Sequence, residues 1–306
     1  MRPTRQKLIE TACLAVLLAG QAFRCQGDLI TNLPPVADTT LFEDAPDNNL
    51  GATATLIAGT TATGFRNRAL VKFDLAGIPA NATITSAALT LNVVKAGSGP
   101  GSTFDLHFML QDWGEGSGTG NQGTPANTGE ATWNNRFHPS TPWNSPGATA
   151  DADYVATISA TNFMDGAGSY TFVSTPGLVS DVQAWLNHPG NNFGWILISE
   201  DEMDLATARR IGSREDPNNT PVLTVQYTVP APPVQPTIAS AARVGDQFQF
   251  SFNAESNRSY TVQYIGALTG TNWGVLTNIS PMLAPANVLV SDPLTTSNRF
   301  YRVRTP

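Results

Sequence analysis

The segment RALVKFDL at residues 68–75 decides the fold class of this chain. Apolar side chains occupy every second position in it, and successive side chains of a β-strand point to opposite faces. The same alternation recurs in ALTLNV at 88–93, in FGWIL at 193–197 and in VLTVQY at 222–227. Strands of this kind pair in packed antiparallel sheets, so the sequence predicts an all-β, jelly-roll-like β-sandwich over residues 28–228.

One segment between the predicted strands has helical spacing instead. Leu178, Val182, Trp185 and Leu186 fall at i, i+4, i+7 and i+8, which places them on one face of a helix. A Pro-Gly pair at 189–190 follows, and this pair is a typical end signal. We therefore expect one short helix within the sandwich.

A proline-rich stretch, VPAPPVQP, separates this region from the C-terminal part of the chain. Such a stretch forms a semi-rigid spacer that cannot join a sheet, so we predict a linker at 229–237. Beyond it, FQFSF at 248–252, YTVQY at 260–264 and FYRVR at 300–304 have strand character. We expect a small immunoglobulin- or fibronectin-III-like β-sandwich over 238–306.

The N-terminus has the features of a secretory signal peptide. Three basic residues within the first seven positions precede an apolar stretch at 12–22, which is too short to span a bilayer. Cleavage after Gly27 satisfies the small-residue rule, and cleavage after Ala22 is the alternative. Lipidation of Cys25 is a further alternative, which the bulky residues before it disfavour. We predict a signal peptide at 1–27 and a secreted, extracellular protein.

Composition excludes several classes of partner. Both cysteines, Cys13 and Cys25, lie in the predicted leader, so the mature chain would have no disulfide and no thiol nucleophile. Its 13 basic and 23 acidic residues give a formal charge of −10. Such a chain should not bind nucleic acid or an anionic membrane through its overall field. No later segment is long and apolar enough for a membrane span.

A polar stretch at 111–153 interrupts the strand pattern and contains three tryptophans, Trp113, Trp133 and Trp143. A loop of this length in a compact domain is usually functional or poorly ordered. The flat rings would suit stacking on sugars. They would equally suit burial as anchors of the loop, because a tryptophan removes about 200 Å² from water. We favour anchoring and keep stacking as the alternative.

The large predicted domain resembles the DNRLRE family, which is related to the disaggregatase-associated and alginate-binding (family 96) carbohydrate-binding modules. The resemblance rests on ADTTL at 37–41, on RALVKFDL, on ATWNNR at 131–136, on VQAWL at 182–186 and on SRE at 213–215. It implies a secreted β-sandwich that binds carbohydrate without catalysis, with some members binding acidic polysaccharide. The C-terminal part is similar to a β module of secreted proteins from Verrucomicrobia-like bacteria.

A set of basic residues is the second candidate site. Guanidinium groups can hold uronate carboxylates in bidentate pairs. Arg68 and Lys72 should share the outer face of one strand. Ordinary surface ion pairing is the alternative. The predicted ligand-binding cations, with Arg66 and Arg209 as weaker members, are Arg68, Lys72, Arg136, Arg210 and Arg214.

Calcium is the third candidate, and we expect no other cofactor. Oxygen ligands close together in the sequence suit Ca²⁺ in a structural site. The first cluster is Glu43, Asp44, Asp47 and Asn49, and a weaker one spans residues 200–204. Neither has EF-hand spacing, and acidic loops are usually only solvated.

No catalytic site is visible in the sequence. The histidines, His107, His138 and His188, lack metal-ligand spacing. Asp112 and Glu115 could imitate a glycosidase pair, but nothing places them across a bond. We predict a non-catalytic protein that binds an extracellular polysaccharide, and both acidic and neutral polysaccharides stay open as its ligand. The alternative is a structural or adhesive surface protein, which buried tryptophans and paired arginines would favour.

Overall fold

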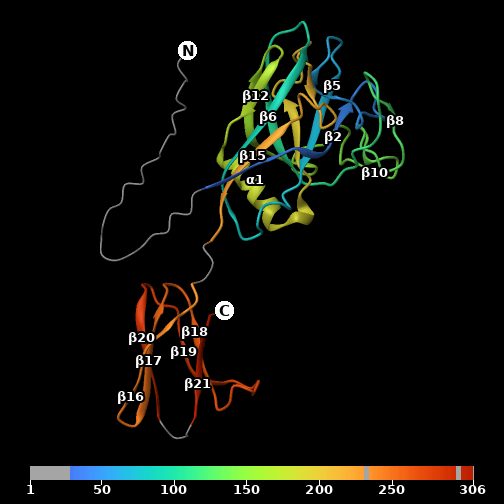
Figure 1. Ribbon diagram of the computed structural model, residues 1–306. Helices are drawn as coiled ribbons and strands as arrows, with labels where there is room; N and C mark the ends of the chain where they lie inside the picture. Colours follow the sequence, from blue (N-terminus) through green and yellow to red (C-terminus); the bar gives the residue numbers. More distant parts are fainter. Residues whose placement is uncertain (1–27, 231–233, 294–297, 306) are drawn as a thin grey trace, which may run out of the picture. The chain divides into compact units, whose positions relative to one another are not determined.

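The computed structural model describes residues 28–230, 234–293 and 298–305 (Figure 1). The chain divides into two compact units, one ending at residue 230 and the other beginning at residue 231. The predicted signal peptide lies outside the described residues, as does part of the predicted linker. Among the described residues, no helix is long and apolar enough to cross a membrane.

The large unit is a curled antiparallel sandwich, which confirms the predicted fold class. One layer contains β1 (Leu29–Leu33), β15 (Val222–Thr228), β6 (Thr83–Ala96), β12 (Gly168–Phe172), β14 (Arg209–Gly212) and β4 (Thr55–Thr60). The other contains β2 (Pro35–Phe42), β5 (Arg66–Phe73), β13 (Trp195–Ser199), β7 (Ser102–Met109) and β11 (Tyr154–Met164). Strand β4 pairs with β14 and, at its end, with β5. The two layers are therefore one continuous eleven-stranded sheet.

The main core lies between the layers, where the alternation in β5 and β6 predicts it. Ala69, Val71 and Phe73 of β5 are buried there with Leu89 and Leu91 of β6. The predicted helix is α1 (Pro176–Asn187), which buries its apolar face in the same core. The Thr175 hydroxyl accepts a hydrogen bond from the Leu178 N–H and caps the helix, and the short helix η1 (Pro189–Asn191) follows it.

A second core covers the opposite face of β5 and β13. Leu70 and Ile196 lie on that face and are fully buried. They pack with the three tryptophans of the 111–153 stretch, with Leu41, Met109, Ala131, Ala148 and Ile198. The long loop, which carries only the short strands β8 (Thr124–Pro125), β9 (Asn135–Phe137) and β10 (Thr141–Pro142), is thus packed onto the sheet.

Asn49, at the end of β3 (Asn48–Asn49), holds this loop from within. Its side-chain amide donates to the carbonyl oxygens of Glu115 and Ala131, at 2.6 and 2.9 Å. Its Oδ1 accepts hydrogen bonds from the backbone N–H groups of Gly51 and Gly118. Asn49 is fully buried and forms hydrogen bonds with four backbone groups. These bonds take the place of the strand-to-strand hydrogen bonds that a loop does not form.

An acidic cluster ties β2 to the same loop. The Arg214 backbone N–H donates to Asp38 Oδ2 at 2.7 Å, and the Arg214 guanidinium pairs with Glu115 and Glu215. Asp38 is almost fully buried, with both glutamates nearby. Burial, followed by repulsion from Glu215 and Glu115, raises the pKa of Asp38 to about 7, and burial also raises the pKa of Glu115.

The small unit is a six-stranded sandwich, as the alternation predicts. One sheet has the order β16 (Ile238–Val244), β17 (Gln247–Ala254) and β20 (Ala286–Pro293). The other has the order β19 (Gly274–Ile279), β18 (Tyr260–Ile265) and β21 (Phe300–Arg304). Phe250, Phe252, Tyr260, Val262 and Val290 form its core.

Replacing Trp133 by Ala should destabilise the large unit by about 3–5 kcal/mol, the usual cost of emptying a buried aromatic site. The ring is buried, and a side chain on Gly147 would collide with it, so its surroundings are closely packed. Chemical denaturation measures the change. Phe163→Ala, at an exposed ring, is the control and should change the free energy by less than about 0.5 kcal/mol. Equal effects for the two variants would contradict the anchoring role.

The stability should also depend on pH through Asp38. Between about pH 4 and pH 7 the folded protein keeps a proton on Asp38 that the unfolded chain has lost, so its free energy of unfolding falls as the pH rises. The slope is at most about 1.4 kcal/mol per pH unit. In Asp38→Asn this contribution is absent. Denaturation at pH 5, 6, 7 and 8 should therefore show the wild type losing stability relative to the variant, and parallel curves would refute the assignment.

Candidate functional site

All three tryptophan rings are buried, which supports the anchoring role and not the alternative of stacking on sugars. Trp113 donates from Nε1 to the Phe193 carbonyl oxygen, and Trp143 donates to that of Thr132, both at 2.8 Å. The guanidinium groups of Arg66 and Arg68 lie 5.2 and 5.5 Å from the centre of the Trp133 ring. Rings that are 3–5% exposed offer no face to a sugar, so they anchor the loop.

Arg68 departs from its predicted role. We expected an open outer face, but the tryptophan loop covers it, and only 8% of Arg68 is exposed. Its guanidinium donates to the carbonyl oxygens of Gly147 and Ala148 and forms a bidentate pair with Glu202. These bonds fasten the loop to β5 and leave little of the group for a ligand.

The other predicted cations, except Arg210, are also engaged within the protein. Arg214 belongs to the acidic cluster with Asp38, and Arg136 donates to the Asp112 carbonyl oxygen at 3.2 Å. Lys72 remains partly exposed and lies 3.4 Å from the Asp112 carboxylate and 5.9 Å from the centre of the Phe193 ring. The predicted cations therefore do not form one continuous basic face.

The predicted calcium ligands do not converge either. Glu43 pairs with Arg66, Asp47 accepts from the Asn134 amide, and Asn49 is used by the loop. Within residues 28–230, 234–293 and 298–305, no group of three or more acidic, histidine or cysteine side chains could hold a metal ion. Asp44 keeps a buried oxygen, Oδ1, that has no hydrogen-bond partner among the described residues. The calcium site stays a prediction without a matching geometry.

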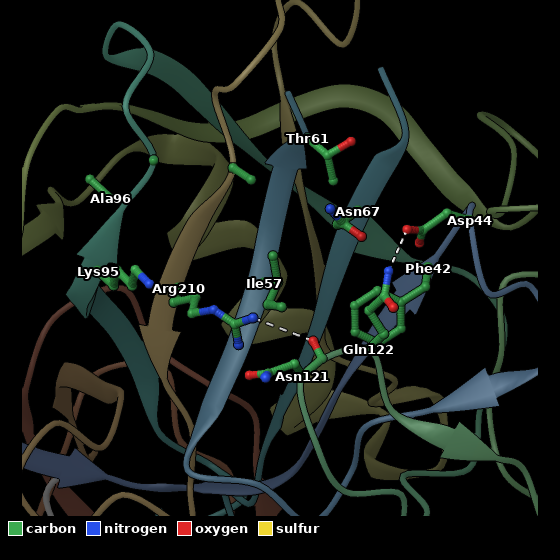
Figure 2. Close-up of a pocket in the computed structure, with 12 residues that line it drawn as sticks. Phe42, Asp44, Ile57, Thr61, Asn67, Lys95, Ala96, Asn121, Gln122 and Arg210 are labelled. Carbon is green, nitrogen blue, oxygen red and sulfur yellow. Dashed lines mark hydrogen bonds between the residues drawn. The ribbon is translucent and has the colours of Figure 1, made fainter. Parts of the chain in front are cut away.

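A depression over β4 brings together two residues that belong to different predicted sites, Arg210 and Asp44 (Figure 2). Its volume is about 280 Å³, and Phe42 and Ile57 form an apolar floor. Figure 2 shows Arg210 on one side of Ile57 and Asp44 on the other. The remaining walls come from β4–β6, β14 and the loop, and include Thr61, Asn67, Lys95, Asn121 and Gln122.

Two cations face one another at one end of this depression. Arg210 of β14 lies directly opposite Lys95 of β6 in the sheet register. Neither side chain forms an ion pair with any described residue, and Arg210 donates only a long hydrogen bond, 3.4 Å, to the Asn121 carbonyl oxygen. Like charges directly opposite on neighbouring strands destabilise a sheet. This end of the depression is therefore suited to an anion.

The other end presents hydrogen-bond acceptors. Asn67 is 2% exposed, and its Oδ1 is buried without a partner among the described residues, as is Asp44 Oδ1. The second Asp44 oxygen accepts from the Gln122 amide at 2.7 Å. Buried acceptors without donors are costly, so this end is suited to groups that donate, such as hydroxyls.

Sequence reasoning missed Lys95 and Asn67 in this site. Lysine is rare in the chain, which could have drawn attention to Lys95, but nothing in the local sequence indicates that Arg210 would face it. Asn67 directly precedes the alternating segment RALVKFDL and belongs to no recognisable sequence motif. The glycosidase-like pair is separated, because Asp112 lies against Lys72 whereas Glu115 lies against Arg214.

Comparison with known proteins identifies the family. The family model for carbohydrate-binding module family 96 matches residues 30–227, which is nearly all of the large unit and more than half of the chain. No curated protein matches the chain. The match supports carbohydrate binding by the large unit. This chain belongs to carbohydrate-binding module family 96.

Proposed function

We propose that the protein is secreted and non-catalytic, and that it binds an acidic, uronate-containing polysaccharide in the β4 depression. The observation that carries this proposal is the unpaired couple of Arg210 and Lys95, opposed across β14 and β6. A ligand carboxylate between them would relieve their repulsion and accept charge-assisted hydrogen bonds. The leader-like sequence at 1–27 supports secretion.

The opposite end of the depression supports a sugar over a simple anion. Hydroxyl groups of the bound sugar unit would donate to Asp44 Oδ1 and Asn67 Oδ1, which lack donors in the described structure. The apolar floor of Phe42 and Ile57 would contact C–H groups of the ring. A uronate unit carries all three kinds of group, so its carboxylate would orient toward Arg210 and its hydroxyls toward Asp44.

A structural or adhesive role without glycan binding is the second candidate. The buried tryptophans and the internal pairing of Arg68 and Arg214 favour it, because these groups stabilise the fold. The two candidates differ in the role of Arg210, which should bind a ligand in the first and need not in the second. Among the described residues, its side chain forms one long hydrogen bond, to the Asn121 carbonyl oxygen.

Affinity electrophoresis of residues 28–306 in gels with alginate, pectate, chondroitin or cellulose tests the proposal. An acidic polymer should retard the wild type, and less so at high salt, because screening weakens exposed charge pairs. Arg210→Gln and Lys95→Gln should each weaken binding roughly tenfold, since hydrogen bonds to charged groups contribute about 1.5–3 kcal/mol. Arg243→Gln, at an exposed cation of the small unit, is the matched control and should bind normally.

If both variants retained full binding, the ligand would have to bind outside this depression. The absence of retardation by any acidic polymer would refute the proposal and favour the structural role. Thermal denaturation of each variant shows whether lost binding reflects lost folding.

A further inference from the structure

We propose that the large unit has a second carbohydrate site, selective for a neutral glycan, in the groove between the end of β5 and helix η1. This proposal does not rest on the acidic-polysaccharide site, with which the groove shares no lining residue. The groove consists of two adjoining cavities of about 430 and 550 Å³, which share Asp74, Pro189 and Asn192. Each of the two volumes lies within the range of roughly 300–1,000 Å³ that is typical of small-ligand pockets.

The walls of the groove are largely apolar. Leu75, Ile78, Pro79 and Leu186 line one half. Val36, which is 43% exposed, lines the other half together with Phe193 and Gly190. Phe193 packs against the tryptophan core. The next residue is glycine because its φ is +77° and a Cβ there would collide with the Val71 carbonyl oxygen. Such surfaces pack against the C–H faces of sugar rings.

Two buried polar atoms of residues that line the groove have opposite requirements, because one lacks an acceptor and the other lacks a donor. Trp185 lines the groove, and its Nε1 N–H has no acceptor within the part of the chain that the structure describes. Asn192 lines both cavities, and its Oδ1 likewise has no donor among the described residues. Its amide nitrogen donates a hydrogen bond to the Phe73 carbonyl oxygen. A hydroxyl group both donates and accepts, so a glycan can satisfy the two atoms.

The charges in the groove select against an acidic ligand. Lys72 lies at 3.4 Å from Asp112, which offsets its charge, and Asp74 adds a second carboxylate to the same lining. An ionised carboxylate in the groove would meet this negative excess and could not donate to Asn192 Oδ1. The groove and the β4 depression therefore have opposite charge preferences.

A blocking substitution tests the groove without disturbing the core. A Cβ added at Gly190 would meet no atom within 4 Å, and Gly190 lines the groove, so Gly190→Gln should fold normally and obstruct the groove. Gly166, on the turn between β11 and β12, is equally open, and Gly166→Gln is the matched control. Isothermal titration of residues 28–306 with cellohexaose, xylohexaose, mannohexaose and laminarihexaose, at two salt concentrations, measures the affinity.

At least one neutral hexasaccharide should bind with an affinity that salt does not change. Gly190→Gln should lower that affinity at least tenfold, and Gly166→Gln and Arg210→Gln should leave it unchanged. In ¹⁵N spectra, the indole N–H signal of Trp185, assigned with Trp185→Phe, should shift on titration. Failure of all four glycans to bind, or binding that survives Gly190→Gln, would overturn the second site. Neither result would alter acidic-polymer binding by Arg210, so the two proposals fail separately.

Discussion

The burial of three tryptophans against the outer face of β5 and β13 is the interaction on which the large unit depends. A sandwich ordinarily keeps one face of each sheet in water, but here Leu70 and Ile196 are removed from water by a loop without long strands. The loop meets its backbone hydrogen-bonding requirement through Asn49 and through the bonds that Arg68 makes with residues 147–148.

Period-two patterns were sufficient to predict the sandwich and the inward face of β5, and helical spacing was sufficient to predict the helix. Ala69, Val71 and Phe73 point to the core that their spacing predicts. The same alternation placed Arg68 and Lys72 on a common face, correctly, but could not show that a loop would cover Arg68. What covers a face depends on contacts across about 80 residues, such as that between Arg68 and Gly147, and local spacing carries no information about them.

The candidate site was predictable only in pieces, for a related reason. Arg210 and Asp44 were singled out for different chemistry, one as a cation for uronates and one as a calcium ligand. Their meeting in one depression follows from strand pairing, because β14 pairs with β4, β4 with β5, and β5 with β2, which Asp44 follows. The register of β14 with β6 also brings Lys95 opposite Arg210, although more than 100 residues separate them in the sequence. Strand register, which sequence patterns leave open, decides the electrostatics of the site.

The position of Arg210 on a strand with two hydrogen-bonded neighbours has a mechanical consequence. A long polymer held there would transmit any pull directly to β14, and β14 is joined by backbone ladders to β4 on one side and β6 on the other. Strand β4 in turn continues into the second layer through β5. Tension would thus be shared among several ladders loaded together, whereas a ligand gripped by a loop tip would peel that loop away one hydrogen bond at a time.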